Sequence, residues 1–339
     1  MARQTGAGMA GTERRKKTEK GAPLPDEPLD RDEHLLVRAA WLSYVGDLTQ
    51  AQIAKRLGLN RIRVNRMLAQ AREQGIVQVR INAKIANCVA LEEQLAARYG
   101  LSEAIVVPSP PDAALVPQTI AVAAGRALSE RIEEGMSIGI GWGRTLRLSI
   151  KSVAVRPVSR LTVVSLLGSL TGGSVLNAYE TASRFADLFD ARCYYFAAPI
   201  LADTEETRDV FVRQRILQDA FERAHNVDLA FMSVGQLGRD TTNFQLGLVG
   251  EDDIRTLGRA GAVGDLCAHF IDENGELVDH PLNRRVIALA PKALREIKTV
   301  ILASGGRDKI AVLRAALRLG VVNVLVTDEE AAEGILAKG

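Results

Sequence analysis

The chain has 339 residues, 47% of them apolar and 25% charged, which is enough for about two domains with hydrophobic cores. No apolar run approaches the length of about 20 residues that a membrane-spanning helix needs, and the N-terminal residues contain no hydrophobic signal segment. The three cysteines are odd in number and widely spaced, which argues against a disulfide framework and fits a reducing cytoplasm. The four histidines are scattered without metal-ligand spacing, so no metal site is predicted.

The net charge of +2 is unevenly distributed along the chain. Residues 1–84 contain 16 Lys or Arg and 9 Asp or Glu, a net charge of +7, whereas residues 85–339 contain 27 and 32, a net charge of −5. Residues 1–30 are polar and rich in Gly, Pro and charge, and we expect them to be disordered. Their basic cluster at 14–17 could touch DNA phosphates, although a solubilising tail is the simpler interpretation. The basic excess in the first part of the chain favours a phosphate-binding module there.

Three helices are predicted after this tail. The first, at 32–45, has an apolar side formed by Leu35, Leu36, Ala39, Ala40 and Leu42. Trp41 and Tyr44 either fill the remaining space against the next helices or form a partner surface. Thr49 and Gln52 form a capping box that begins the second helix, and Gly58 ends it. Asn60 then caps the third.

The second and third predicted helices have the pattern of a helix-turn-helix, whose second helix enters the major groove. Their inward residues are Ala51, Ile53, Ala54, Leu57, Val64, Met67, Leu68 and Ala71. Arginine pairs with guanine edges or phosphates, and asparagine pairs with adenine. The predicted contacts to double-stranded operator DNA are Thr49, Gln50, Asn60, Arg61, Arg63, Asn65 and Arg66. Arginines on a helix usually form only a solvated face, so the prediction depends on the conjunction of caps, turn and outward polar residues, which also include Arg72.

Residues 76–81 alternate like a strand and could form a small wing. Residues 85–100 are predicted to form a helix that connects two domains, with Ile85, Val89 and Leu95 on an apolar stripe that could pair two subunits. Because dimers read paired half-sites, we expect a homo-oligomer, a dimer or a tetramer. The predicted organisation is a tail at 1–30, a helix-turn-helix domain at 31–84, a connector at 85–102 and a larger domain at 103–339.

The larger domain alternates short apolar runs with helical segments. The predicted strands lie at 104–107, 136–140, 161–166, 193–197, 229–234, 300–303 and 321–326. The predicted helices include 119–133, 181–188, 210–224, 309–319 and 329–336. Continuous apolar strands separated by helices predict an α/β fold with a doubly wound, mainly parallel sheet. Ligands bind outside the carboxyl ends of the strands in such sheets.

Glycine-rich turns follow three of these strands, at 141–145, 167–173 and 304–309. Glycines allow close approach of the backbone to a ligand, and a helix N-terminus favours an anion. A single turn of this kind is usually only a tight connection, but three in one sheet favour a shared site. No acidic residue lies between Glu134 and Glu180, where Arg144, Arg147 and other basic residues gather. The acid that a nicotinamide dinucleotide site needs about 20 residues after its glycines is therefore missing, so the pattern favours a phosphate group over NAD.

The order of several motifs resembles the SorC family of sugar-responsive bacterial transcription regulators. They are the helix-turn-helix, GIGWGRTL at 139–146, VVSLLGSL at 163–170, GAVGDLCAHFIDENGELV at 261–278, ASGGRDKIAVLRAAL at 303–317 and LVTDEEAAEGIL at 325–336. The resemblance covers nearly the whole chain after residue 30. It implies an oligomeric regulator whose larger domain is similar to sugar-phosphate isomerases, binds a phosphorylated sugar or polyol effector and needs no cofactor.

The resemblance also implies roles for single residues. Thr145 and the adjacent glycines would hold the phosphate, Asp265 would accept hydrogen bonds from sugar hydroxyls, and Lys309 would contact the phosphate or the sugar. The predicted effector site consists of Gly141, Gly143, Arg144, Thr145, Gly168, Ser169, Asn177, Asp265, Gly305, Gly306 and Lys309. Structural roles are the alternative: Asp265 as a helix cap, Lys309 as an exposed helix start and Asn177 as a turn residue.

Three positions depart from the family pattern. Arg307 and Asp308 add a charge pair after the double glycine, Ser169 replaces a common glycine, and the stretch 234–236 departs from a Gly-Ile-Gly pattern. An alternative function is a sugar-phosphate isomerase or deaminase with a DNA-binding appendage, with Asp265 as the carboxylate of a general base. The predicted turns contain no histidine, although His269 is close to Asp265 in sequence, so we expect a regulator and not an enzyme.

Overall fold

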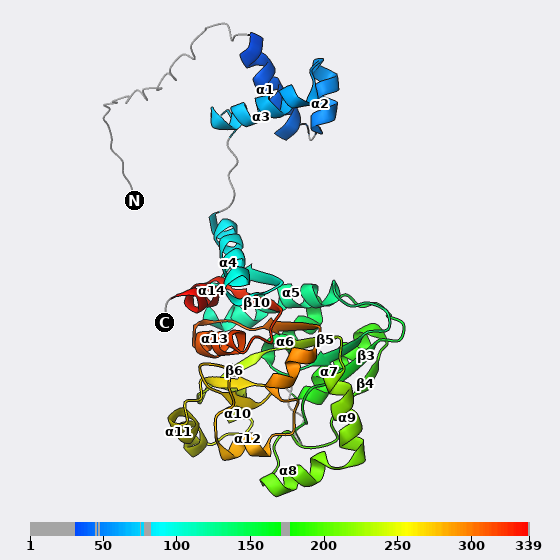
Figure 1. Ribbon diagram of the computed structural model, residues 1–339, viewed down its shortest axis with the longest axis vertical. Helices are drawn as coiled ribbons and strands as arrows, with labels where there is room; N and C mark the ends of the chain where they lie inside the picture. The colour runs from blue at the N-terminus through cyan, green and yellow to red at the C-terminus, as the bar shows by residue number, and fades with distance from the viewer. Residues whose placement is uncertain are drawn as a thin grey trace, which may run out of the picture. The chain divides into compact units, whose positions relative to one another are not determined.

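The computed structural model describes residues 31–337 except 45, 47, 75, 78–82 and 171–176. Its chain forms two compact units, Met1–Arg80 and Ile81–Gly339, which are described separately (Figure 1). Within the described ranges, no helix has both the length and the apolar character required to cross a membrane. The predicted tail at 1–30 lies outside the described residues.

The first unit is a three-helix module made of α1 (Arg31–Tyr44), α2 (Gln50–Leu57) and α3 (Arg61–Glu73). The predicted capping box is present, because the Thr49 hydroxyl accepts from the Gln52 N–H and the Gln52 side chain accepts from the Thr49 N–H at 2.8 Å. Gly58 ends α2 in a left-handed conformation with φ of 64°, which glycine adopts without strain. Asn60 caps α3 by accepting the Arg63 N–H at 2.8 Å.

The core of this module follows the predicted pattern closely. Its buried residues are Leu36, Ala39, Ala40, Leu42, Ile53, Ala54, Val64, Met67, Leu68 and Ala71. One prediction needs correction, because Ala51 is exposed; Leu57 is partly buried and packs against this core. Trp41 and Tyr44 are exposed by 57% and 45%, so they do not fill a space in this core. Of the predicted wing at 76–81, Ile76 and Val77 form a bend, and the rest lies outside the described residues.

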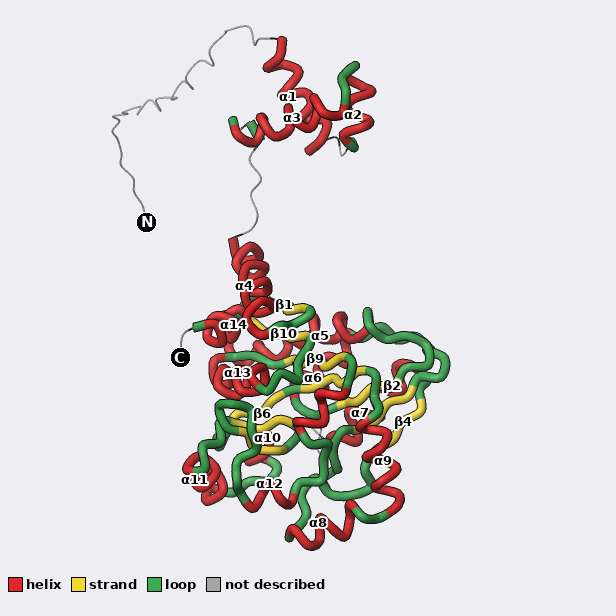
Figure 2. Tube along the Cα trace, viewed as in Figure 1, coloured by secondary structure: helices red, strands yellow, loops and turns green. Residues whose placement is uncertain are grey.

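The second unit is built on a seven-stranded sheet with the strand order β1-β10-β9-β5-β2-β3-β4. Strands are drawn in yellow in Figure 2. All described pairings of this sheet are parallel. In spatial order the strands are β1 (Glu103–Val107), β10 (Val324–Asp328), β9 (Thr299–Ala303), β5 (Leu229–Met232), β2 (Ser137–Ile140), β3 (Thr162–Ser165) and β4 (Arg192–Tyr194). The doubly wound parallel sheet is therefore confirmed. The chain runs from β2 toward β4 in one direction and from β5 toward β10 in the other, so the order reverses between β2 and β5.

Both faces of the sheet are buried because neighbouring residues of a strand point to opposite sides. In β5, for example, Leu229 and Phe231 pack in one core, whereas Ala230 and Met232 pack in the other. The first core is covered by α5 (Val116–Ser129), α6 (Arg144–Ser149) and α7 (Ala178–Phe189). The second is covered by α4 (Ala83–Tyr99), α9 (Arg215–His225), α13 (Ile310–Arg318) and α14 (Glu329–Leu336).

The predicted connector helix, α4, packs on this second unit against β1 and α14. Its Cys88, Leu91 and Leu95 are buried in the core of the unit, whereas Val89 is 48% exposed. The residues predicted to pair two subunits therefore do not share one exposed face of α4, because Leu95 is buried within its own unit. The predicted helix at 210–224 is also divided, into α8 (Glu205–Val212) and α9, with Gln214 in an extended conformation directly before the second.

A small antiparallel sheet, absent from the sequence prediction, follows the carboxyl end of β5. It pairs β6 (Val234–Gln236), β7 (Gly264–Leu266) and β8 (His269–Ile271) in that order. The shorter connecting elements are α10 (Thr242–Gln245), α11 (Glu251–Arg259), α12 (Pro281–Arg285), η1 (Ala113–Leu115), η2 (Ile150–Ser152), η3 (Pro291–Glu296) and η4 (Arg307–Lys309). The two-residue turn between β7 and β8 holds Cys267 and Ala268 at φ of 52° and 61°, a left-handed conformation that is uncommon for residues other than glycine.

Candidate functional site

A cavity of about 510 Å³ opens at the carboxyl ends of β2, β5 and β9, where the strand order of the large sheet reverses. This is the place where open α/β sheets bind ligands. The lining comes from the segments that follow four strands: 142–145 after β2, 233–236 after β5, 305–309 after β9, and Glu330 after β10. The lining is completed by residues 240–243, which run into α10, by Asp265 on β7 and by residues 113, 116 and 117.

The turn after β2 supplies a backbone approach and donors. Gly143 has φ of 129° and begins α6, and Arg144 and Thr145 follow it on the cavity wall. Thr145 is buried, whereas Arg144 is exposed. Gly141 does not line the cavity; it packs against the backbone of β5, where an added Cβ would lie 3.4 Å from the Phe231 carbonyl oxygen.

The turn after β9 brings an ammonium group to the cavity. Gly306 has φ of 92°, and its N–H donates to Asp328 Oδ1 at 2.7 Å, which ties this turn to the end of β10. Lys309 Nζ donates to Ser304 Oγ at 3.2 Å. Burial, opposed by the charge of Asp265 and aided by that of Arg144, lowers the pKa of Lys309 to about 8. The side chain is therefore a cation at neutral pH that a bound anion would stabilise.

Asp265 is a buried hydrogen-bond acceptor on the same cavity. Its residue is only 3% exposed, and burial raises its pKa to about 6. Asn243 Nδ2 donates to Oδ1 at 2.7 Å, and the Ala268 N–H donates to Oδ2 at 3.2 Å. These two donors and Lys309 lower the pKa and so oppose the effect of burial. The carboxylate is the predominant form at neutral pH.

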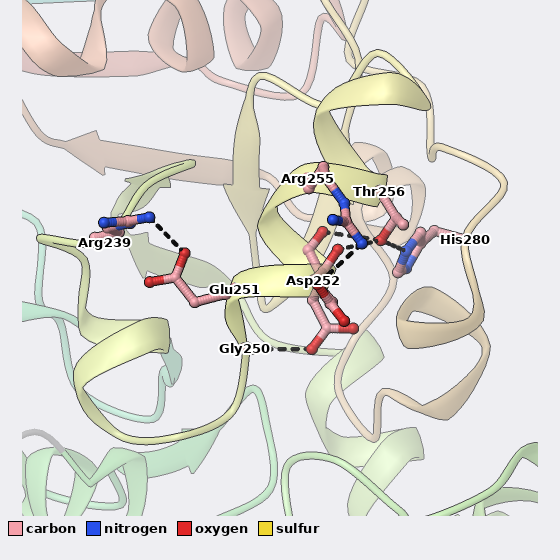
Figure 3. Close-up of polar contacts among 8 residues, drawn as sticks. Arg239, Gly250, Glu251, Asp252, Arg255, Thr256 and His280 are labelled. Atoms are coloured by element: carbon pink, nitrogen blue, oxygen red, sulfur yellow. Dashed lines mark hydrogen bonds and ion pairs between the residues drawn. The ribbon is translucent and has the colours of Figure 1, made fainter.

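The loop between β6 and α11 carries Asn243 to this position. Its ends are joined by an ion pair of 2.9 Å between Arg239 and Glu251 (Figure 3). The start of α11 is stabilised by the Gly250 N–H, which donates to Asp253 Oδ2 at 2.9 Å. Along the same helix, the Thr256 hydroxyl lies 2.9 Å from His280 Nε2 and links α11 to the start of α12. The loop is thus held between the small sheet and α11.

Charged groups of both signs surround the opening. The adjacent placement of Arg307 and Asp308 in the sequence suggested a charge pair. The Arg307 guanidinium pairs instead with Glu330, at 2.7 Å and 2.8 Å. Asp240 and Asp308 are exposed on the rim. The stretch between Glu134 and Glu180, which contains no acidic residue, therefore forms only the part of the cavity wall around Arg144. Other segments of the chain bring acidic side chains to the cavity.

The structure brings seven of the predicted effector residues to one cavity. They are Gly143, Arg144, Thr145, Asp265, Gly305, Gly306 and Lys309. Three others lie elsewhere. Gly168 lets the chain pass the backbone of Pro199, Ser169 bridges to Pro199, and Asn177 caps α7 by accepting the Tyr179 N–H at 3.2 Å. The contacts of Asn177 are thus those of a structural residue at a turn into a helix, the alternative to a ligand contact.

Sequence reasoning missed much of the polar lining of the cavity. The missed residues include Ser233, Gln236, Asp240, Thr241, Thr242, Asn243 and Glu330. The polar run 240–243 after a strand was a signal that could have been used. The stretch 234–236, noted as a departure from the family pattern, does line the cavity.

The predicted DNA-binding residues lie together on the first unit. Asn60, Arg61, Arg63, Asn65 and Arg66 are exposed at the start of α3. Gln50, at the start of α2, connects to them, because it donates to Asn65 Oδ1 at 3.3 Å and accepts from Arg61 Nε at 3.5 Å. Thr49 caps α2 beside them, whereas the side chain of Arg72 lies outside the described residues.

Comparison with known proteins identifies both units. The sugar-binding domain family matches residues 83–337, and a Crp-like helix-turn-helix domain matches residues 34–94. The chain belongs to the SorC family of sugar-responsive transcription regulators. This member of the SorC family is accordingly a DNA-binding transcription regulator of carbohydrate or polyol catabolism.

Relatives of this SorC-family chain are similar over almost their whole length. The erythritol catabolism regulatory protein EryD of Brucella abortus is 30% identical over 311 residues, which cover 91% of this chain and 98% of EryD. The deoxyribonucleoside regulator of Bacillus subtilis is 30% identical over 312 residues, with 91% and 99% covered. The full-length sorbitol operon regulator SorC of Klebsiella pneumoniae superposes with a TM-score of 0.70 at 28% identity, covering 90% of this chain and 99% of that structure.

Proposed function

We propose that the cavity binds a phosphorylated sugar or polyol, and that this effector controls binding to operator DNA. The supporting observation is the division of the cavity into two kinds of groups. Arg144, Thr145 and Lys309 supply donors and positive charge, whereas Asp265 supplies a buried anionic acceptor. A phosphate dianion matches the first set and sugar hydroxyls match the second.

The names of the relatives suggest the ligands to test. Erythritol, sorbitol and 2-deoxyribose, each with its terminal phosphate, form a panel that separates the two parts of the site. We expect a phosphate ester to raise the melting temperature more than its parent sugar at the same concentration, because a ligand that binds only the native state stabilises it by an amount that grows with the logarithm of its affinity. A parent sugar that binds as tightly as its phosphate ester would overturn the phosphate assignment and leave the regulator assignment intact.

Operator binding is assigned to the start of α3, with Arg61, Arg63, Asn65 and Arg66 as the residues that reach base edges or phosphates. We further propose that the protein acts in the cytoplasm as a dimer or tetramer, because one helix-turn-helix module buries little DNA and dimers read paired half-sites. The effector would shift the population of DNA-competent oligomers through its different affinity for the two states.

Catalysis is the second candidate function, and the geometry favours it less. An isomerase needs a general base near the sugar carbon, often a carboxylate with a histidine. Among the described residues that line the cavity, no histidine occurs. His269 is buried, and burial lowers its pKa to about 4; its Nδ1 lies 3.0 Å from the Cys267 carbonyl oxygen. Incubation of the pure protein with the panel, followed by chromatography of the products, tests this candidate directly.

A further inference from the structure

The surroundings of Asp265 disfavour the ionised form of its carboxyl group. It lies on the middle strand of the small antiparallel sheet and is almost fully buried, and the nearby Cys267 thiol has a pKa that is raised by burial and by this carboxylate. A buried carboxylate that is left without donors takes up a proton and stops serving as a strong acceptor. Its use in ligand binding therefore depends on the groups that hold it.

Two donors hold the carboxylate, one at each oxygen. Asn243 Nδ2 reaches Oδ1 from α10, and the Ala268 N–H reaches Oδ2 from the turn between β7 and β8. The second donor requires that Cys267 and Ala268 remain in a left-handed conformation, which residues with a Cβ adopt at an energetic cost. Asn243 is itself 93% buried and lines the cavity beside Asp265.

The neighbouring strand β6 leaves space for the same carboxylate. Gly235 pairs with Asp265 in the β6–β7 ladder. A Cβ added at Gly235 would overlap Asp265 Oδ1, the oxygen that Asn243 contacts. The absence of a side chain at 235 thus leaves the space that this carboxylate orientation needs.

We propose that Asn243 is a positioning residue for effector recognition: it fixes Asp265 as an oriented anionic acceptor, and so makes the loop between β6 and α11 determine selectivity for hydroxylated ligands. The proposal rests on the proposed function, because it assigns Asp265 to sugar hydroxyls. The same loop also presents Asp240, Thr241 and Thr242 to the cavity. One short segment therefore orients the buried acceptor and supplies further polar groups around it.

The first experiment needs no ligand. Protein labelled with ¹³C at the aspartate carboxyl carbons is titrated by NMR, and the Asp265 resonance is assigned with Asp265→Asn. The midpoint for Asp265 should rise by about one pH unit in Asn243→Ala, because a hydrogen bond to a charged group typically corresponds to at least that shift. Gln245→Ala, an exposed position on the same short helix, is the matched control and should not move it.

Other titrating groups near Asp265 are distinguished in the same spectra. Lys309 faces it from the turn after β9, Asp240 lies on the rim, Cys267 lies on the adjoining turn and His269 lies on β8. Burial lowers the pKa of Lys309 to about 8 and that of His269 to about 4, so their effects on the resonance should fall outside the step expected from the pKa of about 6 for Asp265. A midpoint that stays at the wild-type value in Asn243→Ala would overturn the positioning role.

The second experiment measures binding with named probes. At pH 7, sorbitol 6-phosphate, erythritol 4-phosphate and 2-deoxyribose 5-phosphate are titrated calorimetrically into wild type, Asn243→Ala and Gln245→Ala. We expect the affinity for the esters that bind wild type to fall about tenfold or more in Asn243→Ala and to stay unchanged in Gln245→Ala. Inorganic phosphate, which has no sugar hydroxyls, should bind both variants as it binds wild type.

The outcomes separate the proposal from the proposed function. Equal loss of inorganic phosphate and of the esters in Asn243→Ala would show general damage to the cavity and overturn the selectivity role. If the Asp265 titration moves as expected but no member of the panel binds wild type, the proposed sugar-phosphate function fails, and with it the role in selectivity. Circular dichroism melting of each variant identifies any loss of folding before these comparisons are made.

Discussion

Replacement of Lys309 by alanine is the most direct test of the phosphate end of the cavity. With a pKa of about 8, about nine-tenths of the side chains are protonated at pH 7. A charge-assisted hydrogen bond to a phosphate oxygen stabilises a complex by about 1.5–3 kcal/mol. Lys309→Ala should therefore weaken binding of the tightest sugar phosphate by about 10- to 150-fold. Operator binding without effector should be unchanged.

The pH dependence of the same titration gives a second readout. A bound dianion raises the pKa of Lys309, so the wild-type affinity should fall as the pH rises above about 8. It should also fall as the pH drops through about 6, where Asp265 becomes protonated. The alanine variant should lose the fall above pH 8 and keep the lower one, moved to higher pH, because Lys309 no longer lowers the pKa of Asp265.

Lys292→Ala is the matched control for this experiment. Lys292 is an exposed lysine whose Nζ lies 2.5 Å from Glu276 Oε2, and it does not line the cavity. Isothermal titration calorimetry from pH 6 to pH 9 should give wild-type affinities for this control. Wild-type affinity and an unchanged fall above pH 8 in Lys309→Ala would refute the assignment of Lys309 to the phosphate.

Four further predictions concern operator binding, the turn after β9, the core of the first unit and the assembly. Arg63→Ala and Arg66→Ala should each weaken operator binding by about 1–3 kcal/mol in gel-shift titrations with little change in melting temperature. Gly305→Ala should abolish effector binding in calorimetry and lower the melting temperature, because the new Cβ would overlap Asp328 Oδ1. Leu68→Ala should destabilise the first unit by about 2–5 kcal/mol and leave the melting transition of the second unchanged. Light scattering should show a dimer or a tetramer, and a monomer with and without operator would contradict the proposed assembly.

The parts of the fold that depend on local sequence could be predicted. The capping box at Thr49, the left-handed Gly58 and the Asn60 cap are decided by residues within one turn of a helix, and all three are present. The parallel strands could be recognised because both faces of the sheet are buried, which requires continuous apolar runs such as 300–303. Their bounds shifted by a few residues without changing the architecture.

The parts that depend on distant pairing could not be predicted. The small sheet joins Gly235 to Asp265 across a long intervening segment, and neither strand has an apolar run long enough to be recognised. Asn243 lies on a short helix with no periodicity, so its hydrogen bond to Asp265 follows only from the folded chain. For the same reason Gly168, which resembles the glycines of the two cavity turns, proved to contact Pro199 instead.

The positions of the two tryptophans have a spectroscopic consequence. Trp142 is 7% exposed on the wall of the cavity, whereas Trp41 is 57% exposed on α1 of the first unit. Trp142 should emit at shorter wavelength and resist quenching by iodide, and Trp41 should emit at longer wavelength and be quenched. Trp41→Phe then leaves a fluorophore that reports on occupancy of the cavity, and Trp142→Phe leaves one that reports on the DNA-binding unit. Each event can thus be followed by its own emission band in the full-length protein, without an attached dye.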